Sequence, residues 1–314
     1  MKQLGKDILV SAAVGILLPA MILNYGAKVR RMTLQEAQIR ETTAHTPLPV
    51  KVRNEQGIVT EGEMDDYLVG VVLAEMPASF EPEALKAQAI VARTYARKAY
   101  TNGGKHGDGS VCTDPACCQG YLSKEAYLEQ GGTEADVERI SSAVSETSGQ
   151  VLTYGEELIE ATYFSCSGGS TEDAVAVWGT EFPYLQAVDS PGEENAAHYQ
   201  DTVDFLREEL EEKLGVTLGP AVVEAVTYTE GGGVDSISFG GRYFTGTEVR
   251  RLLGLRSTAF SVSAAGNTVT FTTRGYGHRV GMSQYGADAM AVEGKTCQDI
   301  LSHYYRGTTL VQLP

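Results

Sequence analysis

The chain has 314 residues, enough for one large domain or two smaller ones. Hydrophobic residues make up 42% and charged residues 21%, as in ordinary globular proteins. The formal net charge of −16 argues against a general nucleic-acid-binding protein, which needs a basic face to neutralise phosphates, so no nucleic-acid partner is expected.

Residues 8–27 read ILVSAAVGILLPAMILNYGA and contain no charged side chain. About 20 apolar residues are needed to cross a bilayer, so we interpret this segment as a membrane-spanning helix. A cleaved signal peptide is the alternative, although no clear small-residue cleavage site precedes a polar start. The expected organisation is a short cytoplasmic tail at 1–7, an N-terminal transmembrane anchor helix at 8–27, a linker at 28–47 and a folded domain at 48–314.

The remaining pattern predicts an α+β fold with several helices and mainly antiparallel strands, because regular βαβ alternation is absent. The clearest helix is predicted at 82–100, where a proline occupies the first turn, alanines recur and glycines follow. The other predicted elements are a strand at 49–53, a short helix or turn at 61–68, a helix at 123–147, strands at 150–154 and 158–164, a helix at 202–214, a hairpin within 222–239, a short helix at 246–253, a hairpin at 260–271 and a mostly helical end at 283–307.

The apolar run at 67–74 ends in a carboxylate, Glu75, which precedes Met76 and Pro77. A carboxylate on an apolar wall costs free energy unless it is paired, hydrogen-bonded or protonated. Glu75 either caps a helix or reaches solvent, or it is a catalytic acid.

Helical spacing in the segment that follows places Lys86 and Arg93 along one stripe and Gln88 on another. A basic stripe that returns toward Glu75 would orient an anionic or sugar-like ligand. A solvated basic face is the alternative interpretation.

Four possible metal ligands lie in the Gly-rich stretch 103–120: His106, Cys112, Cys117 and Cys118. Thiolate and imidazole groups suit tetrahedral zinc, and four of them would close a structural site. The alternatives are a disulfide between Cys112 and Cys118, or free thiols. Cys117 is the weakest candidate, because adjacent residues must turn sharply to bind one ion together.

Two further stretches carry polar groups beside glycines. Ser167 and Gly168 belong to a Ser-Gly-Gly turn that exposes backbone N–H groups, and Trp178, the only tryptophan, follows it. A Gly-rich segment at 274–286 offers four more polar side chains, but it is not a dinucleotide-binding pattern, so no organic cofactor is expected. A Cys166 nucleophile paired with His278 has no local support. The four polar residues of the second stretch are His278, Ser283, Gln284 and Tyr285.

Together these stretches resemble the stage II sporulation protein D family of peptidoglycan lytic transglycosylases, from about residue 49 to the end of the chain. The matching segments are YLVGVVLAEMP, EALKAQAIVARTYA, SCSGGSTEDA with the following VWG and PYL, and GYGHRVGMSQYGADAMA. The resemblance implies cleavage between N-acetylmuramic acid and N-acetylglucosamine in peptide-stripped glycan, with a 1,6-anhydro product, during engulfment in sporulation. It also implies a cell-membrane location with the catalytic domain outside the cytoplasm.

The resemblance assigns expected roles to individual residues. Glu75 matches the catalytic acid, and a single acid suffices for this chemistry if its pKa is raised by an apolar setting. The implied substrate-binding residues are Lys86, Gln88, Arg93, Ser167, Gly168, His278, Ser283, Gln284 and Tyr285. Clostridial members have a similar His/Cys zinc loop, which implies zinc at His106, Cys112, Cys117 and Cys118.

One position departs from the family pattern, because Arg279 stands where glycine is common between His and Val; it would narrow the cleft or add a charge. The implied partners are glycan strands, a cell-wall amidase and membrane engulfment proteins. Two other functions remain open: a non-catalytic glycan-binding enhancer of an amidase, and a metal-dependent hydrolase.

Overall fold

Helices and short strands alternate irregularly along residues 48–314, the part of the chain that the computed structural model describes. The predicted α+β class is confirmed, since most strand pairs are antiparallel and only two are parallel among these residues. The helices are α2 (Met64–Glu75), α3 (Pro82–Asn102), α4 (Lys124–Glu129), α5 (Glu134–Glu146), α6 (Ala174–Trp178), α7 (Arg207–Leu214), α8 (Gly246–Leu253), α9 (Gln284–Val292) and α10 (Cys297–Tyr304). The strands are β1 (Pro49–Arg53), β2 (Val59–Glu63), β3 (Ser110–Cys112), β4 (Gln150–Tyr154), β5 (Glu157–Leu158), β6 (Tyr163–Phe164), β7 (Gln200–Leu206), β8 (Ala225–Tyr228), β9 (Val234–Phe239), β10 (Arg242–Thr245), β11 (Phe260–Ala265), β12 (Thr268–Arg274), β13 (Met282–Ser283) and β14 (Thr309–Gln312).

The expectation of a transmembrane anchor helix needs correction. Within 48–314, no helix combines the length and the apolar character that crossing a membrane requires. The segment 8–27, on which the expectation rested, lies outside the described residues, as do the expected tail and linker. The expected cell-membrane location rested on that segment and on the resemblance, and no helix among residues 48–314 supports it.

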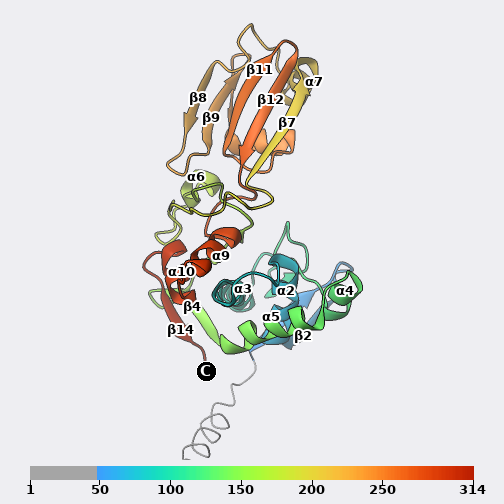
Figure 1. The fold of residues 1–314 in the computed structure, drawn as a ribbon, viewed down its shortest axis with the longest axis vertical. Coiled ribbons are helices and arrows are strands. Elements are labelled where there is room, and N and C mark those ends of the chain that lie inside the picture. The colour runs from blue at the N-terminus through green and yellow to red at the C-terminus, as the bar shows by residue number, and fades with distance from the viewer. Residues whose placement is uncertain (1–47) are drawn as a thin grey trace, which may run out of the picture. The chain divides into compact units, whose positions relative to one another are not determined.

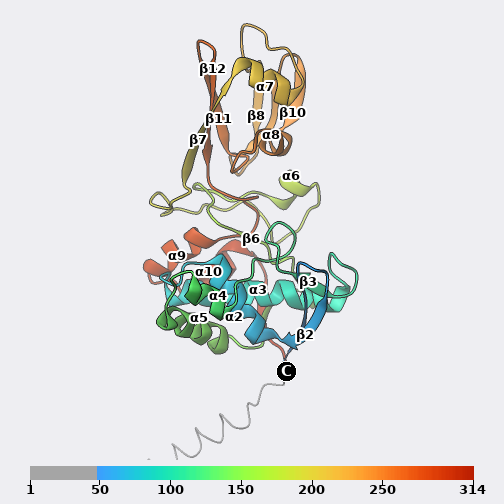
Figure 2. The same cartoon turned by 90° about the vertical axis from the view of Figure 1, so that its right-hand side faces the viewer.

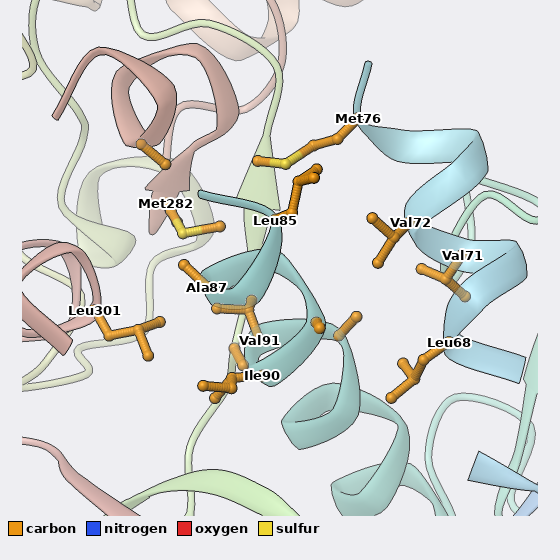
Figure 3. Packing of buried hydrophobic residues seen from close by; sticks show 14 of the residues in the cluster. Leu68, Val71, Val72, Met76, Leu85, Ala87, Ile90, Val91, Met282 and Leu301 are labelled. Carbon is orange, nitrogen blue, oxygen red and sulfur yellow. The ribbon is translucent and has the colours of Figure 1, made fainter. Parts of the chain in front are cut away.

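Helix α3 is the centre of the first hydrophobic cluster; its predicted start is confirmed, and it ends two residues after the predicted end. Its first turn contains Pro82, and Gly103 ends it with a positive φ of 86° that suits a residue without Cβ. Figure 3 shows Leu68 and Val72 of α2 on one side of α3 and Met282 and Leu301 on the other. Since α3 also contacts α5, α9 and β4, it fixes the distance between α2 and the C-terminal helices.

The segment 200–274 has a hydrophobic cluster of its own. Two antiparallel sheets, in the orders β10-β9-β8 and β11-β12-β7, form it together with α7 and α8. Figures 1 and 2 show this segment as a β-rich group apart from α2, α3 and α5. The hairpins predicted within 222–239 and at 260–271 are confirmed.

The helix predicted at 202–214 is wrong in its first half. Residues 200–206 form β7, and α7 begins only at Arg207. Val203 and Phe205 pack on the second hydrophobic cluster while β7 pairs along the whole of β12, so sheet formation overrides the local helical pattern.

Four other predicted elements change in extent. Where a short helix or turn was predicted at 61–68, β2 runs to Glu63 and α2 begins at Met64. The helix predicted at 123–147 is two helices, α4 and α5, separated near Gly131, and β3 lies inside the predicted loop 103–120. The strand predicted at 158–164 is interrupted: β5 pairs with β4, whereas β6 pairs in parallel with β13. The β6–β13 pair brings the Ser-Gly-Gly turn beside the Gly-rich segment 274–286.

Candidate active site

Glu75 is the last residue of α2, and its carboxyl is half-buried beside three segments that are distant in sequence. The Gly120 N–H donates to Oε1 at 2.6 Å, and the Gln284 Nε2 lies 3.4 Å from Oε2. Burial raises the pKa of Glu75 above its usual value, because desolvation disfavours the charged form. Hydrogen bonds from Gly120, Gln284 and Tyr163 act in the opposite direction and stabilise the carboxylate.

A pocket of about 690 Å³ opens beside Glu75. It contains a second carboxylate, Asp136, which the sequence reasoning missed. Asp136 accepts hydrogen bonds from the N–H and hydroxyl of Thr133 at the start of α5, and these bonds lower its pKa. Glu75 and Asp136 therefore have opposite electrostatic settings in one pocket. Its lining residues are Leu73, Ala74, Glu75, Thr113, Pro115, Gly120, Tyr121, Leu122, Tyr127, Gln130, Gly131, Gly132 and Asp136.

A buried amide, Gln119, connects this pocket to its surroundings. Its Nε2 donates to the Tyr163 hydroxyl at 3.1 Å, and its Oε1 accepts from the Tyr67 hydroxyl at 3.3 Å. The Tyr163 oxygen is thereby used as an acceptor, which leaves its proton to be donated to Glu75. Gln119 therefore orients Tyr163 toward Glu75; the sequence reasoning identified neither residue.

The four predicted metal ligands converge. The ligand atoms of His106, Cys112, Cys117 and Cys118 all lie within 4.8 Å of one another. The His106 Nε2 is 3.8 Å from the Cys117 Sγ and 3.6 Å from the Cys118 Sγ, and the two sulfurs are 3.9 Å apart. The turn that brings the adjacent cysteines together is closed by their N–H groups, which both donate to the carbonyl of Asp114.

This donor set fits a tetrahedral zinc ion. Bonds of about 2.0–2.3 Å to zinc require ligand atoms about 3.5–3.8 Å apart, close to the separations seen. All five cysteines are free, so the alternative disulfide between Cys112 and Cys118 is not formed. A possible His/Cys metal-binding cluster is thus present, and Gly120, the donor to Glu75, follows it by two residues.

The helix α3 residues expected to line a cleft make contacts inside the protein. The guanidinium of Arg93 is fully buried and binds Asp65 at 3.0 Å and the carbonyls of Val144 and Gln150. Lys86 bridges Glu83 and Glu146 at 2.9 and 2.7 Å. These ion pairs join α3 to α2 and α5, a role that helical spacing alone did not reveal.

Gln88 differs from the two basic residues of α3. It is fully buried, and neither its Oε1 nor its Nε2 has a hydrogen-bond partner among the described residues. A buried amide without a partner is rare and costly.

The Ser-Gly-Gly turn surrounds an internal carboxylate, Glu193, which the sequence reasoning missed. Its Oε2 accepts from the N–H groups of Ser167 and Gly168 at 2.6 and 3.2 Å, and its Oε1 accepts from the Ser167 hydroxyl at 2.8 Å. The Cys166 thiol also donates to Glu193, and burial with this carboxylate raises the pKa of Cys166. A thiol held protonated is a poor nucleophile, which argues further against a Cys166–His278 pair.

The Gly-rich segment reaches the site through Gln284. Ser283 caps α9 by accepting the Gly286 N–H, and Tyr285 packs its ring on Phe80 at 5.0 Å. The His278 ring lies 5.6 Å from that of Phe164 and 5.4 Å from that of Trp178. Burial lowers the pKa of His278 to about 4, so this imidazole is neutral at neutral pH.

Arg279 neither narrows a cleft nor adds a free charge. Its side chain is buried, forms an ion pair with Glu172 at 3.0 Å, and donates to the carbonyls of Ser167, Ser170 and Gly231. Its φ of 65° is in the left-handed region that favours glycine. Among the described non-glycine residues it alone adopts such a φ, which explains why glycine is common at this position.

Comparison with known proteins agrees with the resemblance. Residues 52–154 match the family model described as Stage II sporulation protein. The chain is 39% identical to Stage II sporulation protein D of Bacillus subtilis (strain 168), over 99% of this chain and 96% of that protein. It is 39% identical to the protein of the same name from Bacillus amyloliquefaciens, over 88% and 83%. An amidase enhancer of Bacillus subtilis is 30% identical over 77% of this chain and 40% of its own length.

Proposed function

Because this chain belongs to the stage II sporulation protein D family, we propose that it is a lytic transglycosylase of sporulation. Its proposed substrate is peptide-stripped peptidoglycan, cleaved between N-acetylmuramic acid and N-acetylglucosamine. The observation that carries the proposal is the Glu75 carboxyl, whose pKa is raised by burial beside a pocket of about 690 Å³. A general acid must retain its proton near neutrality, and desolvation has that effect.

In the proposed reaction one carboxyl group acts twice. Oε1 accepts the Gly120 N–H at 2.6 Å, whereas Oε2 has the longer 3.4 Å contact to the Gln284 Nε2, so in this proposal the proton is on Oε2 and is donated to the glycosidic oxygen as its bond to the muramic acid carbon breaks. The 6-hydroxyl of the same muramic acid then attacks that carbon and gives its proton to the Glu75 carboxylate. The product is a 1,6-anhydro sugar, and the acid is regenerated. Hydrogen bonds from Gly120, Tyr163 and Gln284 stabilise the carboxylate between the two steps.

We also propose that His106, Cys112, Cys117 and Cys118 hold a structural zinc ion. Four protein ligands complete a tetrahedral shell, so the ion would stabilise the loop and would not bind substrate. This assignment disfavours the metal-dependent hydrolase, which requires an open coordination position.

The second candidate function is the enhancement of a cell-wall amidase. It is favoured by the 30% identity to a protein named amidase enhancer. Under this function the pocket binds glycan without cleaving it. Proposed partners under either function are glycan strands and a cell-wall amidase.

The deciding experiment incubates the full chain alone with peptide-stripped glycan and identifies the products by mass spectrometry. We expect 1,6-anhydro products from the wild type and none from Glu75→Gln, which retains the shape of the side chain. Asp136→Asn serves as the matched control in the same pocket, and we expect it to remain active.

Three outcomes would contradict the proposal. Cleavage of the glycan by Glu75→Gln would exclude Glu75 as the catalytic acid. Loss of cleavage in a folded Asp136→Asn, together with wild-type products that lack the anhydro ring, would indicate a two-carboxylate hydrolase. No cleavage by the wild type, together with stimulation of an amidase, would support the enhancer.

A further inference from the structure

Four ring side chains lie in two contacting pairs, and each pair has one member that is exposed at the surface. They are Trp178, His278, Tyr276 and His198, and we call them the aromatic strip. Trp178 is 41% exposed and lies 5.4 Å from His278, while Tyr276 is 43% exposed and lies 5.1 Å from His198. Tyr276 and His278 are separated along the chain only by Gly277, so the two pairs are neighbours in sequence.

The edge of the strip carries planar polar groups. The Arg256 guanidinium lies 5.6 Å from the centre of the Tyr276 ring, contacts the His198 Nδ1 at 2.7 Å and pairs with Asp201 at 3.0 Å. The carbonyl of Arg256 accepts the Gly277 N–H at 3.1 Å, which fixes the pair beside the strip. Arg256 is therefore balanced by Asp201, and His278 is neutral at neutral pH, while Arg250 is a cation that acts on both His278 and Tyr276.

The strip connects to the candidate active site through β6. Tyr163 hydrogen-bonds Glu75, and the next residue, Phe164, packs its ring against His278. Successive strand residues point to opposite faces, so Glu75 and the strip lie on either side of β6. In Figures 1 and 2, α6, which ends at Trp178, lies between the β-rich segment 200–274 and α9.

Exposed aromatic rings with a few planar hydrogen-bonding groups at their edge are suited to a ligand that has an apolar face and a polar rim. A pyranose ring has this form: its C–H groups pack on aromatic rings and its hydroxyls bond to side chains such as Arg256 and Asp201. A polyanion such as nucleic acid requires an extended basic surface, which is not expected here because Arg256 is paired with Asp201 and the chain has a formal net charge of −16.

We propose that the aromatic strip binds N-acetylglucosamine rings of the glycan strand outside the bond that Glu75 cleaves. The proposal rests on the proposed function for its choice of polymer. The strip is a separate site that holds a neighbouring part of the same strand, so its contribution appears on long strands and is lost on fragments too short to reach both sites.

The only tryptophan of the chain reports on the strip directly. We would titrate the full-length Glu75→Gln protein with the hexamer of N-acetylglucosamine and with peptide-stripped glycan, and follow tryptophan emission together with calorimetry. We expect a saturable emission change with the hexamer and none with the monomer. Tyr276→Ala should weaken binding about tenfold, as expected for loss of an aromatic anchor, whereas Tyr276→Phe should bind as tightly as the parent.

Trp178→Ala provides a second measurement by calorimetry, and Tyr243→Ala is the matched control, since Tyr243 is 68% exposed on β10 and outside the strip. Unchanged affinity in both folded strip variants, or an equal loss in Tyr243→Ala, would overturn the proposal. Its failure is distinguishable from failure of the proposed function. If the wild type cleaves glycan but strip variants bind normally, only the strip proposal fails; if strip variants lose binding but the wild type does not cleave, only the transglycosylase proposal fails.

Discussion

At the scale of single residues, the setting of Glu75 affects stability as well as chemistry. Its pKa in the folded protein is raised, so the folded state binds this proton more tightly than the unfolded state. The stabilisation is fully present below the unfolded pKa and is lost as the pH rises through the raised folded pKa. A neutral amide avoids that loss.

We therefore expect Glu75→Gln to melt at a higher temperature than the wild type at neutral pH. The difference should disappear below about pH 4, where both states of the wild type are protonated. Scanning calorimetry over this range measures it, with Glu156→Gln, an exposed residue of the β4–β5 turn, as control. A lower melting temperature for Glu75→Gln at neutral pH would contradict this expectation, because it would show that the folded protein stabilises the charged form of Glu75 relative to the unfolded state.

Tyr163 affects the pKa of the same carboxyl group. Its hydroxyl donates to the Glu75 carboxylate and so lowers the pKa of that group. In Tyr163→Phe this donor is gone, so the pKa of Glu75 rises further and the alkaline limb of kcat/KM moves to higher pH. The measurement is the pH–rate profile on peptide-stripped glycan, with Tyr154→Phe, exposed on β4, as control. A merely structural role for Tyr163 would lower the rate without moving the limb.

The sequence pointed to Glu75 as a candidate acid and, through the resemblance, to Gln284, but it did not show that these two residues lie together. A carboxylate at the end of an apolar run is a local pattern, readable from neighbouring residues. Its donors are not local: Gly120 is 45 residues away and Gln284 is 209 residues away. Glu193 was missed for the same reason, because it lies in an irregular segment and most of its donors, Cys166, Ser167 and Gly168, are about 25 residues earlier in the chain.

At the scale of elements, the His/Cys loop supports the site. Residues 106–118 carry the four candidate ligands, and Thr113 and Pro115 of the same loop line the Glu75 pocket. Gly120, two residues further, makes the shortest contact to Glu75. Loss of a structural metal would free this loop, and the Glu75 carboxyl would lose its strongest donor.

We expect chelation of the proposed zinc to increase hydrogen exchange across residues 106–120 and to slow glycan cleavage. Exchange in the buried middle of α3 should remain slow, since its packing does not depend on the loop. Metal content should fall from about one ion per chain to none in Cys118→Ala and stay unchanged in Cys297→Ala, which alters a cysteine outside the cluster. Unchanged exchange in residues 106–120 after full metal removal would rule out this supporting role.

Element prediction failed where two periodicities overlap. The stretch 202–214 has acidic residues and leucines at helical spacing in its second half, and α7 forms there. In its first half, Val203 and Phe205 alternate with polar residues, the pattern of a strand with one buried face. Residues 200–206 form a strand because β12, some 65 residues later in the chain, pairs with β7 along its whole length.

At the scale of the whole described molecule, the chain builds two hydrophobic clusters and passes between them. Residues before 189 and after 279 form the first cluster, while the second lies entirely within 205–271. The buried pair Arg279–Glu172 is one connection between them. Glu172 accepts hydrogen bonds from Thr229 and Gly233, and Arg279 donates to Gly231, so both reach one turn of the β-rich segment.

Replacing Arg279 by glycine tests this connection. Glycine relieves the positive φ, which costs a non-glycine residue about 1–2 kcal/mol. It also leaves the Glu172 carboxylate buried without its cation, and breaking such a pair typically costs about 3–5 kcal/mol. The second effect is larger, so we expect a net loss of about 1–4 kcal/mol in the free energy of unfolding by urea.

The double variant Arg279→Gly with Glu172→Gln removes the unpaired charge and should recover much of that loss. Arg306→Ala is the matched control, an exposed arginine near the C-terminal end of the chain whose removal should change little. Hydrogen exchange should rise first in the turn 229–233, because that turn loses both its arginine donor and a firmly placed carboxylate. If Arg279→Gly were as stable as the wild type, the connection would be dispensable and the positive φ would be the dominant cost at this position.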